Sequence, residues 1–74
     1  MMLTKQYIKD NNIKEYYICV DGMNNDKFAR CETMKDVKKA MRDYDKECDG
    51  DFEPLLFKYN RETKSMEYIE DWSY

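Results

Sequence analysis

Residues 33–48 read TMKDVKKAMRDYDKEC and carry the clearest structural signal in this chain of 74 residues. Thr33 is a suitable helix N-cap, and Asp36 stands three residues later, as in a shortened capping box. Gly50 and Pro54 end the helical pattern. The segment predicts an amphipathic helix over about 34–47, because apolar side chains recur at helical spacing at Met34, Val37, Ala40, Met41, Tyr44 and Cys48.

Two strand-like segments precede this helix. Residues 15–20 are aromatic and β-branched, with Tyr16, Ile18 and Val20 on one face. After polar turn residues at 21–26, residues 27–32 read as a second strand, with Phe28 and Arg30 on one face and Ala29 and Cys31 on the other. The two segments predict a β-hairpin.

Two more strands are expected after the helix, over 55–60 and 65–70, joined by a polar turn at 61–64. Thr4 can cap a short N-terminal helix over roughly 5–11. The predicted fold is a single α+β domain, residues 1–74, of order αββαββ. It has a four-stranded, mainly antiparallel sheet with one amphipathic helix packed across it and a short N-terminal helix.

One helix covers only one face of such a sheet. The other face must be solvated, covered by the N-terminal helix or used in self-association. The aromatic residues exceed what one helix can cover, so a homodimer is a possible arrangement; they are Tyr16, Tyr17, Tyr59, Tyr68, Trp72 and Tyr74.

Composition argues against several classes of function. The chain has no histidine, two glycines and no phosphate-binding loop, so we do not expect an enzyme. Cys19, Cys31 and Cys48 share no metal-binding spacing, and neither a disulfide framework, a metal site nor a cofactor is expected. No stretch suggests a signal peptide or a membrane span. We expect a cytoplasmic protein with no membrane partner.

Acidic side chains on alternate residues are the strongest sign of function. They are Asp43, Asp45, Glu47, Asp49, Asp51 and Glu53, with Lys46 the only cation among them. Residues 43–74 hold ten anions and four cations, whereas residues 27–42 hold six cations and two anions. The net charge is only −3, so we expect a two-sided charge distribution.

The acidic row has three interpretations. From Asp45 onward it resembles a calcium loop, but the twelfth position, which requires a bidentate Glu, is Leu56. Alternatively, carboxylates on alternate residues of an extended segment recur every ~6.6 Å, close to the separation of phosphates. Glu67, Glu70 and Asp71 could then widen the acidic patch of a nucleic-acid mimic. The third interpretation is a solvated loop after a helix.

Two other binding modes remain open. The aromatic sheet face, together with Trp72, could bind a partner in an adaptor or assembly module. Alternatively, the cations from Lys35 to Arg42 could bind nucleic acid, although Asp36, Asp43 and Asp45 on the same helix oppose this.

In size and composition the chain resembles small early proteins of bacteriophages that infect low-GC Gram-positive bacteria. Many of these host-takeover proteins inhibit one host protein, and some are acidic DNA mimics. The residues that match this behaviour run from Asp43 to Glu53. The resemblance implies an inhibitor in the bacterial host cell that occludes a basic DNA-binding protein, such as an HU-type nucleoid protein, without binding nucleic acid directly.

Overall fold

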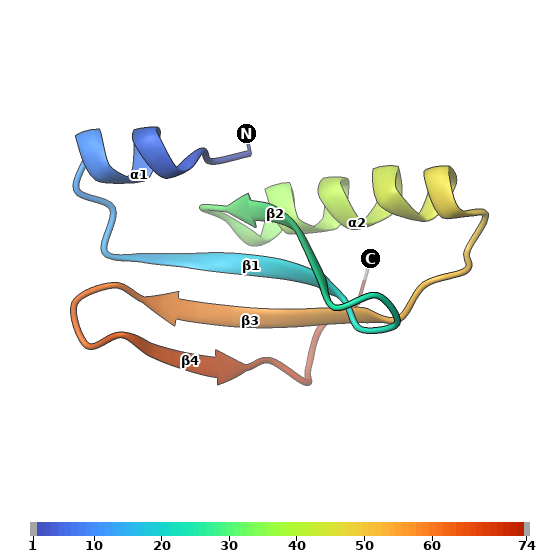
Figure 1. Cartoon of the computed structure of the whole chain (residues 1–74). Coiled ribbons are helices and arrows are strands. Elements are labelled where there is room, and N and C mark those ends of the chain that lie inside the picture. Colours follow the sequence, from blue (N-terminus) through green and yellow to red (C-terminus); the bar gives the residue numbers. More distant parts are fainter. Residues whose placement is uncertain (1, 74) are drawn as a thin grey trace.

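The computed structural model describes residues 2–73 and contains two helices and four strands in the predicted order (Figure 1). Tyr74, one of the aromatic residues considered above, lies outside the described residues. The elements are α1 (Lys5–Asp10), β1 (Glu15–Asp21), β2 (Asp26–Cys31), α2 (Met34–Cys48), β3 (Pro54–Asn60) and β4 (Ser65–Tyr68).

The strands form one antiparallel sheet in the order β2-β1-β3-β4. Each predicted hairpin is present, and α2 connects them so that β3 pairs with β1 in the centre of the sheet. The predicted α+β fold, with a four-stranded sheet, one packed helix and a short N-terminal helix, is confirmed.

Helix α2 begins and ends where its sequence indicates. Thr33 Oγ1 accepts a hydrogen bond from the Asp36 N–H at 3.2 Å, as an N-cap residue does. At the other end, Asp49 and Gly50 adopt positive φ angles of 52° and 76°. The Gly50 N–H donates to the carbonyl of Asp45 at 2.9 Å, which closes the last turn.

The main core lies between α2 and one face of the sheet, where α2 packs against β1 and β2. Val37 and Met41 on the helix are fully buried against Cys19 on β1 and Leu56 on β3. The predicted apolar stripe is therefore the buried face of the helix. Tyr44 and Cys48 continue it at the margin of the core.

The second face of the sheet is only partly covered. Leu3 and Ile8, from the N-terminal segment and α1, pack with Tyr16 in a second apolar cluster. Farther along this face, on the edge strand β4, Met66 and Tyr68 keep 44% and 49% of their surface exposed.

Two predicted details are wrong. Phe28 was placed with Arg30, but a β-bulge opposite Cys19 and Val20 leaves it without a strand partner, and it packs on the α2 side. The last strand ends at Tyr68 instead of residue 70, because the chain then turns and Ile69 packs into the main core.

The three thiols differ in accessibility, which gives a test of the packing. Cys19 and Cys31 are fully buried, and a hydrogen bond to the Cys31 thiol, together with burial, raises the pKa of Cys19. Cys48 is half-buried. We expect a thiol-specific chromogenic reagent to label Cys48 first in the native protein and the other two only on unfolding. If the native Cys48→Ser variant were labelled as fast as the unaltered protein, this packing would be contradicted.

Candidate functional site

The acidic row does not have the extended geometry that its spacing suggested. Asp43, Asp45 and Glu47 lie in the last turns of α2, Asp49 caps the helix, and the rest of the row lies in the loop before β3. A helix turns about 100° per residue, so Asp43 and Glu47 share one side and Asp45 lies on another. These three residues lie within the helix predicted over 34–47, so the ~6.6 Å repeat of an extended segment does not apply to them.

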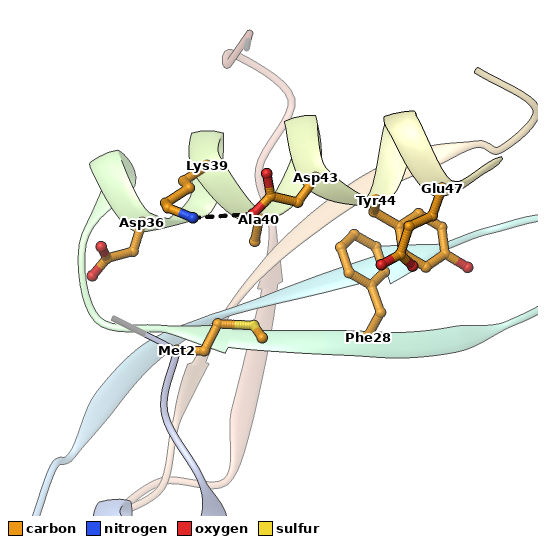
Figure 2. Close-up of a pocket in the computed structure, with 8 residues that line it drawn as sticks. All are labelled: Met2, Phe28, Asp36, Lys39, Ala40, Asp43, Tyr44 and Glu47. Carbon is orange, nitrogen blue, oxygen red and sulfur yellow. Dashed lines mark hydrogen bonds and ion pairs between the residues drawn. The ribbon is translucent and has the colours of Figure 1, made fainter. Parts of the chain in front are cut away.

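A groove of about 370 Å³ lies between α2, β2 and the N-terminal segment. Its helical wall is built from residues spaced three and four apart, which places them in one stripe. Figure 2 shows these side chains along one side of α2, facing Met2 and Phe28; they are Asp36, Lys39, Ala40, Asp43, Tyr44 and Glu47.

The floor of the groove is aromatic. The Phe28 and Tyr44 rings stack with their centroids 3.9 Å apart and an interplanar angle of 15°. Phe52 meets the Tyr44 ring edge-on at 5.1 Å. The β-bulge explains this arrangement, because it turns Phe28 from the face shared with Arg30 to the face below α2.

Most carboxylates at this end of the molecule have no internal counter-charge. Asp43 pairs with Lys39 Nζ at 3.1 Å on the exposed helix surface. Among residues 2–73, no cation forms an ion pair with the other five carboxylates of the row, which are Asp45, Glu47, Asp49, Asp51 and Glu53. All six lie around the C-terminal end of α2 and the loop that follows, next to the β1–β2 turn (Figure 1). We call this region the acidic end.

A buried carboxylate, Asp21 at the end of β1, organises the acidic end. Its oxygens accept hydrogen bonds from the Tyr44 hydroxyl at 3.0 Å and from Asn24 Nδ2 at 3.0 Å. They also accept from the N–H groups of Met23 and Glu53, at 3.0 and 3.3 Å. Burial alone would raise the pKa of Asp21, but these donors together hold it below its usual range. The same bond to Asp21 raises the pKa of Tyr44.

The loop between α2 and β3 is fixed to the β1–β2 turn at a second point. The Gly22 N–H donates to the Glu53 carbonyl at 2.8 Å. A Cβ at position 22 would lie 2.9 Å from the Glu53 Cδ and Leu55 Cδ1 atoms, so a larger residue there would have to displace the ends of these two side chains.

The other predicted partner-binding carboxylates do not join the acidic end. Glu67 lies on the edge strand β4, opposite Lys58 in the register. Asp71 lines a shallow depression with Met34 and Lys38, beside the first turns of α2. Glu70 is exposed between these two positions. The sequence-based prediction places these three residues in the same acidic patch as the row. In the structure β3 and β4 lead the chain away from the row, so the three residues lie elsewhere.

Trp72 also lies apart from the aromatic face with which it was grouped. It packs against the main core on the α2 side. Phe57 and Tyr68, whose rings are 5.4 Å apart, belong to the opposite face of the sheet. Trp72 and these two rings therefore lie on opposite sides of the sheet.

The cations from Lys35 to Arg42 are divided between two sides of α2. Lys39 lines the groove, whereas Lys38 lies beside Trp72. The structure thus does not gather them into one basic stripe.

The calcium-loop interpretation does not match the local structure. Asp45 and Glu47 are helical, and Leu56 is fully buried in β3. Within residues 2–73, no group of three acidic, cysteine or histidine side chains is placed to hold a metal ion.

The sequence alone does not predict the groove along α2, because its parts come from three separate segments. Asp43 and Glu47 are four residues apart, and residues at this spacing share a helix face. This spacing alone indicates that the two carboxylates lie on the same side of the helix, next to Tyr44. The residues next to Met2 and Phe28 in the sequence do not indicate that these two side chains would contact the helix.

Comparison with protein-family models, curated proteins and solved structures gave no match for this chain. Neither helix in the described part of the chain has the length and apolar character needed to cross a membrane. The fold and the groove define a small α+β domain with an acidic, partly apolar surface.

Because the pKa of Asp21 is lowered in the folded state, the stability of the fold depends on pH and falls in acid. An unfolded Asp titrates near pH ~3.9, so this carboxylate stabilises the fold above that pH, and the contribution is lost as the pH falls through the folded-state pKa. We expect Asp21→Asn to lower the urea midpoint at neutral pH and to flatten its decline in acid. Urea unfolding across this pH range tests this, with the exposed Asp10→Asn as control. Parallel curves for Asp21→Asn and the unaltered protein would contradict it.

Proposed function

We propose that this chain is a non-catalytic protein-binding domain that captures a basic protein surface in the groove along α2. The observation that carries the proposal is the continuity of two features. An apolar floor is rimmed by carboxylates and by Lys39, and the rim continues into the acidic end. Of the acidic-end carboxylates, Asp43 pairs with Lys39, and the other five form no ion pair within residues 2–73.

Arginine and lysine side chains fit such a groove because they are amphipathic. Their aliphatic stems pack on apolar surface while the charged heads stay at the rim. In this groove the stem would lie on Met2 and the Phe28–Tyr44 pair, and the head would reach Asp43 or Glu47. A guanidinium group gains more than an ammonium group, because it also stacks on aromatic rings and binds carboxylates through two donors.

A further step within this proposal is that the target is a basic nucleic-acid-binding protein. Such proteins present arrays of Lys and Arg that neutralise phosphates. The acidic end would occupy these cations and exclude nucleic acid, which makes the domain an inhibitor of the kind that the phage resemblance implies. Clustering of the charges supports this step, although Asp43, Asp45 and Glu47 lie in a helix and do not have the ~6.6 Å spacing of an extended segment.

A synthetic arginine-rich peptide tests the groove directly. We expect the Asp43→Asn/Glu47→Gln double variant to bind a fluorescent peptide of alternating Arg and Ala about two- to thirty-fold more weakly, from about 0.2–1 kcal/mol per exposed ion pair. Fluorescence anisotropy measures the affinity. The matched control is Asp10→Asn/Glu62→Gln, which removes the same charge far from the groove. If both double variants weakened binding equally, the loss would be explained by net charge alone. The proposal that the peptide binds in this groove would then be rejected.

Displacement of DNA tests the inhibitor step. We expect the unaltered domain to release a labelled duplex from a purified HU-type protein at about 50 mM salt and to lose this ability by about 200 mM. The Asp45→Asn/Asp49→Asn/Asp51→Asn variant should release much less DNA, with its fold checked by circular dichroism. Failure at low salt would reject mimicry of nucleic acid for this target. Release that survives both high salt and neutralisation would point instead to the surface formed by the exposed Met66 and Tyr68 and the half-buried Phe57.

A further inference from the structure

A second groove, of about 430 Å³, lies at the end of the molecule opposite the acidic end. It is bounded by α1, by the face of the sheet that α2 does not cover and by the turn between β3 and β4 (Figure 1). Five of its lining side chains are cationic; they are Lys5, Lys9, Arg30, Arg61 and Lys64. No carboxylate lines it.

Three carboxylates that are close to the groove residues in sequence form their bonds with residues that do not line this basic groove. Asp10 accepts a hydrogen bond from Gln6, Glu15 pairs with Lys58, and Glu62 pairs with Lys14. Lys5, Lys9, Arg30 and Lys64 form no ion pair with any residue in 2–73. Like charges held together in this way repel one another, and an anionic ligand would relieve that repulsion.

Hydrogen bonds within the protein hold the segments that form the basic groove together. Arg61 Nη1 donates to the carbonyls of Ile8 and Ile13, at 3.3 and 3.0 Å, and its backbone N–H donates to the Lys14 carbonyl at 2.8 Å. These bonds tie the β3–β4 turn to the end of α1 and to the start of β1. The lysines of α1 are therefore held over the sheet by hydrogen bonds between segments far apart in the sequence.

Two tyrosines supply an aromatic floor with free hydroxyls. Tyr16 and Tyr59 are direct cross-strand neighbours, with rings packed edge-on at 5.6 Å. Neither hydroxyl has a hydrogen-bond partner within residues 2–73, and no side-chain polar atom there is both buried and unpaired. Both hydroxyls therefore reach solvent and can bond to a ligand.

We propose that the basic groove binds a nucleotide through its phosphates, as a free nucleotide or within a single strand. The cations supply charge-assisted hydrogen bonds to phosphate oxygens. The groove is larger than one phosphate requires and lies within the ~300–1,000 Å³ range of small-molecule sites. The partly exposed ring of Tyr59 offers the aromatic contact that a base can use and that an inorganic anion cannot.

Calorimetric titration at low salt tests this proposal with three probes: pyrophosphate, ADP and a ten-residue thymidine oligonucleotide. We expect ADP to bind more tightly than pyrophosphate. The Lys5→Gln/Lys9→Gln variant should lose at least about ten-fold in ADP affinity through its lost phosphate contacts. The matched control is Lys35→Gln/Lys38→Gln, which removes the same charge from α2 and should bind ADP as the unaltered protein does. Tyr59→Phe keeps the ring and removes the hydroxyl, and should weaken binding less.

The three probes also separate the two sources of the ligand. Tighter binding of the oligonucleotide than of ADP, with a salt slope reduced by about two in Lys5→Gln/Lys9→Gln, identifies a single strand as the ligand. Preference for ADP identifies a free nucleotide. Absence of binding by all three probes overturns the proposal, as does equal loss in the two lysine variants. Asp43 and Glu47 do not line the basic groove, so their variants should leave ADP affinity unchanged and the two proposals fail independently.

Discussion

The hydrogen bonds to the buried carboxylate of Asp21 are the interactions on which the acidic end of the molecule depends. This carboxylate receives donors from the β1–β2 turn, from α2 through Tyr44 and from the α2–β3 loop through Glu53. A buried charge is tolerated only where hydrogen bonds replace its hydration, and here they come from segments up to 32 residues apart. The bond to Asp21 also holds the Tyr44 ring against Phe28, so the same contact that closes the fold shapes the floor of the groove along α2.

This arrangement places negative charge at the C-terminal end of α2, where it does not stabilise the helix. The C-terminal end of a helix carries partial negative charge and favours cations, yet carboxylates surround that end of α2, with Lys46 as the only basic residue in its last turn. Asp21 adds a buried charge close by. Stability alone does not account for this distribution, whereas a cationic partner would be attracted by the full set.

The sequence was sufficient for elements whose cause is local. The periodicity from Met34 to Cys48, the caps at Thr4 and Thr33 and both hairpins all follow from residues a few positions apart. It was insufficient wherever distant segments decide the outcome. The bulge that turns Phe28 toward α2, the burial of Asp21 and the return of Trp72 to the main core depend on pairing and packing across the chain. The sequence was sufficient to place the first half of the acidic row in the helix, but not to show that the row would surround the buried Asp21.

The net charge of −3 is a poor guide to what this domain attracts, because its charges are separated in space. The molecule measures 35 Å along its longest axis, and a Debye length at physiological ionic strength is only ~8 Å. A partner at the acidic end therefore experiences those carboxylates almost without the distant cations of α1 and Arg61. The same screening isolates the basic groove from the acidic end. Each surface thus acts according to its local charge, and a nearly balanced total is what two oppositely charged binding surfaces on one small domain would produce.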